Sequence, residues 1–153
     1  LISPRLKEEV TRFIFAGALK MNSIFAVNQN VKDEMIKKIE LVMSQPEQIK
    51  ILQGEDTAEF YIIATGECEC FVKDENRKER FVRTLYPGMH FGEIALITGN
   101  RRTATIQTKN YSTIGSISKD HFLEFLHTFP EIKKKLHQSL TLYQDRYKVW
   151  QKN

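Results

Sequence analysis

The chain of 153 residues contains little cysteine, only Cys68 and Cys70, and its four histidines are scattered. The two cysteines stand two apart in an alternating segment. We therefore expect them to be neighbours on one side of a strand, unbridged, as in a reducing compartment. The histidines share no metal-ligand spacing, and no further cysteine or histidine cluster completes a zinc site. We expect no bound metal and no disulfide framework.

Long apolar runs are also missing from the sequence. The longest, Phe60 to Ala64 and Ile94 to Ile97, fall far short of the roughly 20 residues of a membrane-spanning helix. No basic stretch leads into an apolar segment after Leu1, so we expect no signal peptide and interpret the start as the cut end of a longer protein. No Gly-x-Ser-x-Gly elbow or other nucleophile motif is present, and we expect no catalysis.

The composition that is present is ordinary for one globular domain, with 41% hydrophobic and 27% charged residues. A chain of this length can bury a sizeable core. The net charge of +4 and the isoelectric point near 9.0 favour anionic partners without identifying one. The densest basic run, Lys133 to Lys135, is expected to be a solvated helix face, and no helix-turn-helix pattern indicates a nucleic-acid partner.

Helical periodicity marks both ends of the chain. Ser3 followed by Pro4 predicts a helix start, and Asn30 is the expected cap of a second helix. Ser118 is the expected cap of a third helix, and Pro130 is expected to begin a fourth. The apolar positions that mark these helices keep one face apolar in the first, Leu6, Val10, Phe13, Ile14 and Met21, and recur every four residues in the second, Val31, Met35 and Ile39. The third is expected to run through Phe122, Leu123, Phe125 and Leu126.

The middle of the chain changes to a period of two. Strands are expected around Ile49 and Ile51, over Phe60 to Ile63, around Cys68, Cys70 and Val72, and over 103–108 and 111–117. Short strands at close spacing, flanked by helices, predict an α+β fold whose core is a jelly-roll-like β-roll.

The last helix carries one continuous apolar stripe. Its members are Ile132, Leu136, Leu140, Tyr143, Tyr147 and Trp150, at helical spacing. Core packing is the simpler explanation of the stripe. The alternative is a mobile lid, in which the aromatic faces of Tyr143 and Tyr147 close over a flat ligand.

The segment with the clearest chemistry lies between residues 91 and 105. Gly92 frees the backbone, and Glu93 to Ile97 predict a helical turn whose first amides attract an anion. Two consecutive arginines then enter a strand on opposite faces, so only one guanidinium faces the pocket. An ionised Glu93 is an acceptor only and needs a donor such as a ribose hydroxyl. The combination fits a phosphate joined to a sugar.

This segment resembles the phosphate-binding cassette of cyclic-nucleotide-binding domains, through Phe91-Gly92-Glu93-Ile94-Ala95 and Arg102-Thr103-Ala104. The resemblance implies that Gly92 and Ala95 offer backbone to the cyclic phosphate and that Glu93 binds the ribose 2′-hydroxyl. It also implies that Arg102 pairs with the phosphate and that Thr103 adds a hydroxyl. The resemblance covers most of the chain from about Phe25 onward.

The resemblance further implies a short phosphate-binding helix, a C-terminal lid helix, and cAMP or cGMP as the ligand, with no other cofactor. The sequence leaves the choice between the two purines open. The ligand-binding residues that it implies are Phe91, Gly92, Glu93, Ile94, Ala95, Arg102, Thr103, Ala104, Cys70, Leu85, Tyr143, Arg146 and Tyr147.

The first helix, with Pro4 to Val10 followed by Leu19 and Ile24-Phe25, looks like the linker helices of hyperpolarisation-activated and cyclic-nucleotide-gated channels. This likeness implies partial linker helices over 1–23, a β-roll over 24–130 and a lid helix over 131–153. It also implies a cytosolic domain of a homo-tetrameric cation channel, in which ligand binding moves the flanking helices. Four alternatives stay open: a regulatory subunit of a cyclic-nucleotide-dependent kinase, a bacterial-type transcription activator, a cupin-like metal enzyme, and a domain that binds nothing and serves as an interface.

Overall fold

The computed structural model describes residues 2–140. The elements in chain order are α1 (Pro4–Lys20), α2 (Gln29–Lys38), β1 (Glu40–Ser44), β2 (Ile49–Ile51), β3 (Glu59–Thr65), β4 (Cys68–Lys73), β5 (Glu79–Leu85), β6 (His90–Phe91), α3 (Glu93–Thr98), β7 (Thr105–Thr108), β8 (Ser112–Ser118) and α4 (Lys119–Thr128). A further helix covers residues 130–140.

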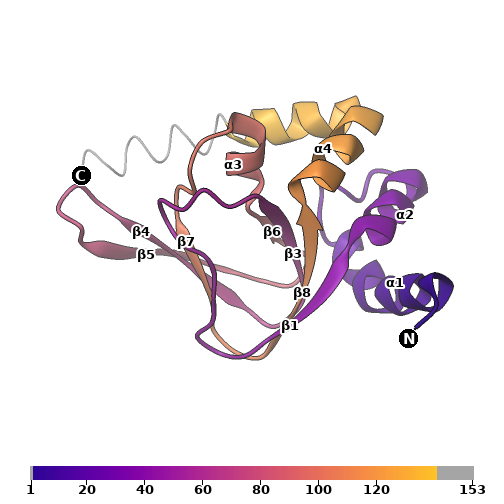
Figure 1. Cartoon of the computed structure of the whole chain (residues 1–153), viewed down its shortest axis with the longest axis horizontal. Helices are drawn as coiled ribbons and strands as arrows, with labels where there is room; N and C mark the ends of the chain where they lie inside the picture. The colour runs from indigo at the N-terminus through magenta and orange to yellow at the C-terminus, as the bar shows by residue number, and fades with distance from the viewer. Residues whose placement is uncertain (1, 141–153) are drawn as a thin grey trace.

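The strands form two antiparallel sheets of four, in the orders β1-β8-β3-β6 and β2-β7-β4-β5, and the expected β-roll within an α+β fold is confirmed. Figure 1 shows α1 and α2 beside the first sheet, while the β4–β5 hairpin of the second extends away on the opposite side. The roll thus has one face covered by helices and an interior enclosed between the sheets.

Strand β3 separates two hydrophobic clusters. Phe60 and Ile62 belong to the cluster beneath the helices, whereas Tyr61 and Ile63 belong to the cluster between the sheets. Successive side chains of a strand point to opposite faces, so a strand buried on both faces is apolar without interruption. The run from Phe60 to Ala64 is therefore the strand that holds the two halves of the domain together.

Helix α1 begins as expected, because the Leu6 N–H donates to the hydroxyl of Ser3 at 3.2 Å. Its expected apolar face is for the most part not the buried one, however. The buried side chains are Thr11, Phe15, Ala18 and Leu19. Of the expected members, only the half-buried Ile14 packs against the core, while Leu6, Val10, Phe13 and Met21 are exposed, Phe13 by 88%. The helix carries two apolar faces, and tertiary packing selects between them.

The choice of face follows from a glycine in β8. A Cβ at Gly115 would lie 2.9 Å from ring atoms of Phe15 and 2.9 Å from Cγ2 of Ile39. The missing side chain lets the fully buried Phe15 ring lie directly on the sheet. This contact fixes α1 against the roll.

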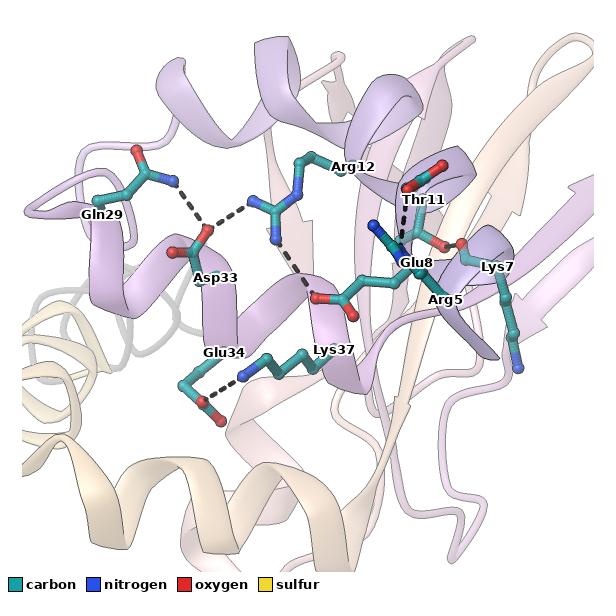
Figure 2. Close-up of polar contacts among 10 residues, drawn as sticks. Arg5, Lys7, Glu8, Thr11, Arg12, Gln29, Asp33, Glu34 and Lys37 are labelled. Carbon is teal, nitrogen blue, oxygen red and sulfur yellow. Dashed lines mark hydrogen bonds and ion pairs between the residues drawn. The ribbon is translucent and has the colours of Figure 1, made fainter. Parts of the chain in front are cut away.

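An ion-pair network joins α1 to α2 (Figure 2). The Arg12 guanidinium lies 2.5 Å from Asp33 and 3.4 Å from Glu8, and Gln29 donates to the same Asp33 carboxylate at 2.9 Å. These hydrogen bonds lower the pKa of Asp33. The two N-terminal helices are therefore tied to each other by polar contacts as well as by the core.

Other expectations differ in detail. The cap of α2 is Asn28, whose side chain accepts from the Val31 N–H, and not Asn30. The cap at Ser118 is confirmed. Three strands that were not expected, β1, β5 and β6, all lie at sheet edges. Edge strands face solvent and lack a clean apolar alternation, which is why the sequence pattern does not mark them.

The helix at 130–140 begins at Pro130 as expected, and its Ile132 and Leu136 are buried in the cluster beneath the helices. This part of the apolar stripe is core packing. The expected lid residues Tyr143 and Tyr147, and the stripe's last member Trp150, lie outside the described residues. Within residues 2–140, no helix combines the length and the apolar character needed to cross a membrane.

Candidate functional site

A cavity of about 50 Å³ lies where the short helix α3 meets the interior between the sheets. The sequence-predicted site residues that line it are Cys70, Leu85, Phe91, Gly92, Glu93, Ile94, Ala95, Arg102, Thr103 and Ala104. They come from β4, β5, β6, α3 and the loop before β7. The structure therefore brings together every predicted ligand residue that lies within the described part of the chain; Tyr143, Arg146 and Tyr147 lie outside it.

Gly92 sets the start of α3. Its φ of 93° is left-handed, and a Cβ there would lie 2.7 Å from the Glu59 carbonyl oxygen and 3.2 Å from Nη1 of Arg102. Only glycine meets both conditions without strain. As the N-cap residue, Gly92 also offers no side chain to the first amides of the helix. Those amides have no acceptor within the helix, and the residues that carry them, 93–95, line the cavity.

Arg102 is the inward arginine of the pair and is only 4% exposed. Its Nε donates to the Thr57 hydroxyl at 2.8 Å, and its Nη1 and Nη2 donate to the carbonyl oxygens of Gly92 and Glu59, each at 2.7 Å. Burial lowers the pKa of Arg102, against the opposing effect of nearby Tyr61 and of carboxylates. The guanidinium is held rigidly from three segments.

Arg101 takes the opposite orientation, as expected from the alternation. It is exposed and donates to the Gly54 carbonyl oxygen at 3.1 Å. Thr103, which is exposed, and the half-buried Ala104 follow on the rim of the cavity. The loop thus presents one buried cation and one rim hydroxyl to the same space.

Glu93, at the first position of α3, is held quite differently. None of the side-chain hydrogen bonds within residues 2–140 involves its carboxylate, and the titratable side chain beside it is His90, whose Nε2 lies 3.8 Å from Oε1. The other ring nitrogen of His90, Nδ1, lies 2.9 Å from the side-chain amide nitrogen of Asn22. Burial lowers the pKa of His90, against an upward effect of Glu93 and together with a downward effect of Arg83.

A second cavity of about 340 Å³ adjoins the first, and the two share Arg83, Leu85, His90, Glu93 and Ile94. Its volume is within the range of small-molecule sites, roughly 300–1,000 Å³. Residues Ser139 and Leu140 of the C-terminal helix line its far side. A ligand with one end at Arg102 therefore has room to extend toward that helix.

Four residues that line the first cavity were missed by sequence reasoning: Ile51, Arg83, His90 and Ile106. Arg83 could have been predicted from the sequence, because it stands two residues before Leu85 on β5 and so shares its face. The sequence gives no signal for His90, since its partner Asn22 is 68 residues away in the chain. Within residues 2–140, no group of three or more histidine, cysteine or acidic side chains is placed to hold a metal ion.

Comparison with known proteins identifies the family. The model of the cyclic nucleotide-binding domain matches residues 42–129, a span that contains every residue lining the first cavity. Of the residues lining the second cavity, those at 21–24 and 139–140 lie outside the span. The chain is also 31% identical over 141 residues to the cyclic nucleotide-gated channel cone photoreceptor subunit alpha of Gallus gallus, covering 88% of this chain and 19% of the relative.

A second relative is the potassium/sodium hyperpolarization-activated cyclic nucleotide-gated channel 3 of Homo sapiens, 29% identical over 134 residues, with 87% of this chain and 17% of the relative covered. The chain thus spans less than a fifth of the length of these channel relatives.

Solved structures share the fold. The regulatory domain of Toxoplasma gondii PKA, solved with cAMP, matches with a TM-score of 0.78 at 18% identity, covering 88% of this chain and 51% of that one. The catabolite activator protein of Thermus thermophilus matches with a TM-score of 0.74 at 18% identity, covering 82% and 60%. On the match of the family model and of the channel relatives, the chain belongs to the cyclic nucleotide-binding domain family.

Proposed function

We propose that this domain binds a cyclic purine nucleoside monophosphate, with the ring phosphate between Arg102 and the start of α3. The ribose would lie against Glu93 and the base would extend toward Leu85 and the C-terminal helix. Membership of the family supports this assignment. The chemistry of the cavity supports it independently, through one residue.

That residue is Arg102, which is a buried cation without an anion. It is 4% exposed, yet none of the ion pairs within residues 2–140 includes it, and its three side-chain acceptors are all neutral oxygens. Burying a charge is costly unless it is paired. A guanidinium held in this way is suited to an anion that arrives from outside the protein.

The donor count agrees with this interpretation. A guanidinium carries five N–H donors, and three of those of Arg102 are used by the protein. Two remain for phosphate oxygens, in addition to the uncapped amides of α3. A ring phosphate carries a single negative charge, which one guanidinium and a few amides can balance.

We place the ribose and the purine of the ligand from the other side chains that line the cavity. An ionised Glu93 accepts only, so it suits the ribose 2′-hydroxyl and is unsuited to a second phosphate. Cys70 and Leu85 belong to the apolar cluster between the sheets and offer the purine a nonpolar surface. Tyr143, Arg146 and Tyr147 remain the proposed residues of the closing helix.

We propose that ligand binding moves the flanking helices. We also propose that the parent protein is a homo-tetrameric cation channel that carries this domain on the cytosolic side of the membrane. The channel relatives support that context. The structural likeness to a kinase regulatory domain keeps a regulatory subunit as the second candidate. In each case the domain would act by binding and not by catalysis.

Calorimetric titration of the 153-residue chain with cAMP and with cGMP tests the proposal. We expect saturable heat with at least one of them and none with inorganic phosphate or 5′-AMP at the same concentration. The 5′-monophosphate is the sharper control, because its phosphate carries about one extra charge at neutral pH and is not tied to the sugar ring. Absence of heat and of any melting shift with both cyclic nucleotides at millimolar concentration would refute the assignment.

A further inference from the structure

The carboxylate of Glu93 depends on a neighbour outside its own helix. It accepts none of the hydrogen bonds found within residues 2–140, and its side chain is 21% exposed. The nearest charged or polar contact that the structure gives it is Nε2 of His90, at 3.8 Å. This separation is too long for a hydrogen bond, but a proton on Nε2 would point an N–H toward the carboxylate. The protonation of this ring therefore matters for the site.

Asn22, just after α1, determines which ring nitrogen carries the proton. Its Oδ1 accepts from the backbone N–H groups of Ile24 and Phe25, at 3.0 and 3.2 Å. The orientation of the side-chain amide is thereby fixed, with Nδ2 as the donor. Nδ2 donates to the Gly88 carbonyl oxygen at 3.0 Å and faces Nδ1 of His90 at 2.9 Å. Nδ1 must accept, so a neutral ring carries its proton on Nε2.

The ring itself has little freedom. It packs edge-on against Phe25, with ring centroids 5.3 Å apart, and stacks on Phe60 at 5.7 Å. Both phenylalanines are fully buried. The packing fixes the plane of the imidazole and the Asn22 bond fixes its polarity, so a neutral ring carries its proton on Nε2, the atom that lies 3.8 Å from the Glu93 carboxylate.

We propose that His90 is a positioning residue that aims the Glu93 carboxylate at the ribose 2′-hydroxyl through its Nε2–H, and that Asn22 selects the required tautomer from the end of α1. The proposal rests on the proposed function, since it assumes that a ribose occupies the site. It also gives α1 a direct polar route to the ligand. Movement of Asn22 relative to β6 would release His90, and with it the carboxylate.

The charges around the ring make this arrangement sensitive to pH. Glu93 favours the imidazolium, whereas burial and the Arg83 guanidinium oppose it. A proton added at Nδ1 would face the Asn22 amide donor and break their bond. Burial and the Asn22 amide therefore favour the neutral ring, with its proton on Nε2.

The test compares ligands that differ only in the 2′-hydroxyl. Affinities of 3′,5′-cAMP and 2′-deoxy-3′,5′-cAMP are measured by calorimetry for the wild-type chain, for His90→Phe, which keeps the aromatic packing, and for His90→Gln, whose amide can restore a donor. The matched control is His121→Phe, at an exposed position of α4.

We expect His90→Phe to weaken binding of the ribonucleotide by about five- to tenfold, the size of one ordinary hydrogen bond, and to leave the deoxy ligand within about twofold. His90→Gln should recover part of the loss, and His121→Phe should match the wild type. An equal loss on both ligands would mean that His90 acts only through the fold and would overturn the proposal. A wild-type chain that binds neither ligand would instead refute the proposed function and this inference with it.

Nitrogen-15 NMR of the imidazole rings tests the tautomer separately. We expect His90 in the wild-type chain to show a protonated Nε2 and an unprotonated Nδ1 at pH 7.5. In Asn22→Asp the carboxylate accepts where the amide donated, so the proton should move to Nδ1 and the preference for the 2′-hydroxyl should fall. A protonated Nδ1 in the wild-type chain, or an unchanged preference in Asn22→Asp once the proton has moved, would contradict the proposed role of Asn22.

Discussion

The two charged side chains of the cavity are held in opposite ways. Arg102 is 4% exposed and is fixed by three hydrogen bonds to Thr57, Gly92 and Glu59. Glu93 is 21% exposed, and its closest partner, His90, stands 3.8 Å away. The phosphate half of the site is therefore assembled by the roll alone, whereas the ribose half depends on a side chain that is itself held by the N-terminal helices.

This difference separates affinity from response. A group that is already fixed costs little to organise when the ligand binds, and it contributes mainly to affinity. A group whose orientation differs between two arrangements of the helices can shift the balance between them, because a ligand acts only through its differential affinity. We expect changes at Arg102 to weaken binding of any cyclic nucleotide and changes near Glu93 to alter what binding does to α1.

The largest expected effect is that of Arg102→Ala. The loss of a buried hydrogen-bonded partner of a charge costs about 2–5 kcal/mol, or more than tenfold in affinity. Calorimetry should show the loss equally with 3′,5′-cAMP and with its 2′-deoxy form. The exposed neighbour variant Arg101→Ala is the control and should retain the wild-type affinity. Wild-type affinity in Arg102→Ala would show that Arg102 does not bind the phosphate and would refute the proposed phosphate site.

The second prediction concerns the glycine that opens α3. Gly92→Ala combines a left-handed residue with a collision at the Glu59 carbonyl oxygen, and should destabilise the domain by about 2–5 kcal/mol. Gly99→Ala at the other end of α3 also has a positive φ, 73°, but open space around it. It should cost only about 1–2 kcal/mol. Urea unfolding of the two variants isolates the collision, and equal losses would show that the close approach at Gly92 is unimportant.

The third prediction applies to the loosely held half. Glu93→Gln keeps the shape of the side chain and removes its charge, so binding of 3′,5′-cAMP should weaken by about 1.5–3 kcal/mol, the contribution of a hydrogen bond to a charged group. Binding of the 2′-deoxy form should change by less than half of that. Glu131→Gln, on the exposed face of the C-terminal helix, serves as the control. A Glu93→Gln variant that discriminates between the two ligands as the wild type does would exclude contact with the ribose.

The contrast also explains what the sequence could predict. The helix at 93–98 and its glycine depend on residues that are close in the chain, so spacing and backbone chemistry suffice. Spacing also predicts that only one arginine of the pair faces inward, and the resemblance to the cassette indicates Arg102. The core face of α1 and the role of His90 depend on contacts made across the fold. Leu6, Val10 and Phe13 form as regular a stripe as the buried face, and the packing of Phe15 on Gly115, which is distant in the chain, favours the other face.

The smallest expected effect is on the pH dependence of the free energy of unfolding, to which His90 in the ribose half of the site contributes and Arg102 in the phosphate half does not. Burial lowers the pKa of His90 below its ordinary 6.5, so as the pH falls through that value the unfolded chain takes up a proton before the folded chain does. The free energy of unfolding must then decrease, by no more than about 1.4 kcal/mol per pH unit for one proton. Arg102 stays charged throughout and adds nothing to this slope.

Urea unfolding between pH 7.5 and 5.5 measures the slope, and the comparison with His90→Phe isolates the part due to this ring, because the remaining titrating groups are common to both chains. We expect the variant to lose less stability on acidification than the wild type, while His121→Phe follows the wild type. Equal slopes in all three chains would mean that His90 gains its proton as easily in the folded domain as in the unfolded one. Burial against Phe25 together with the Asn22 bond would then not hold the ring neutral, and the ribose half of the site would be as independent of α1 as the phosphate half.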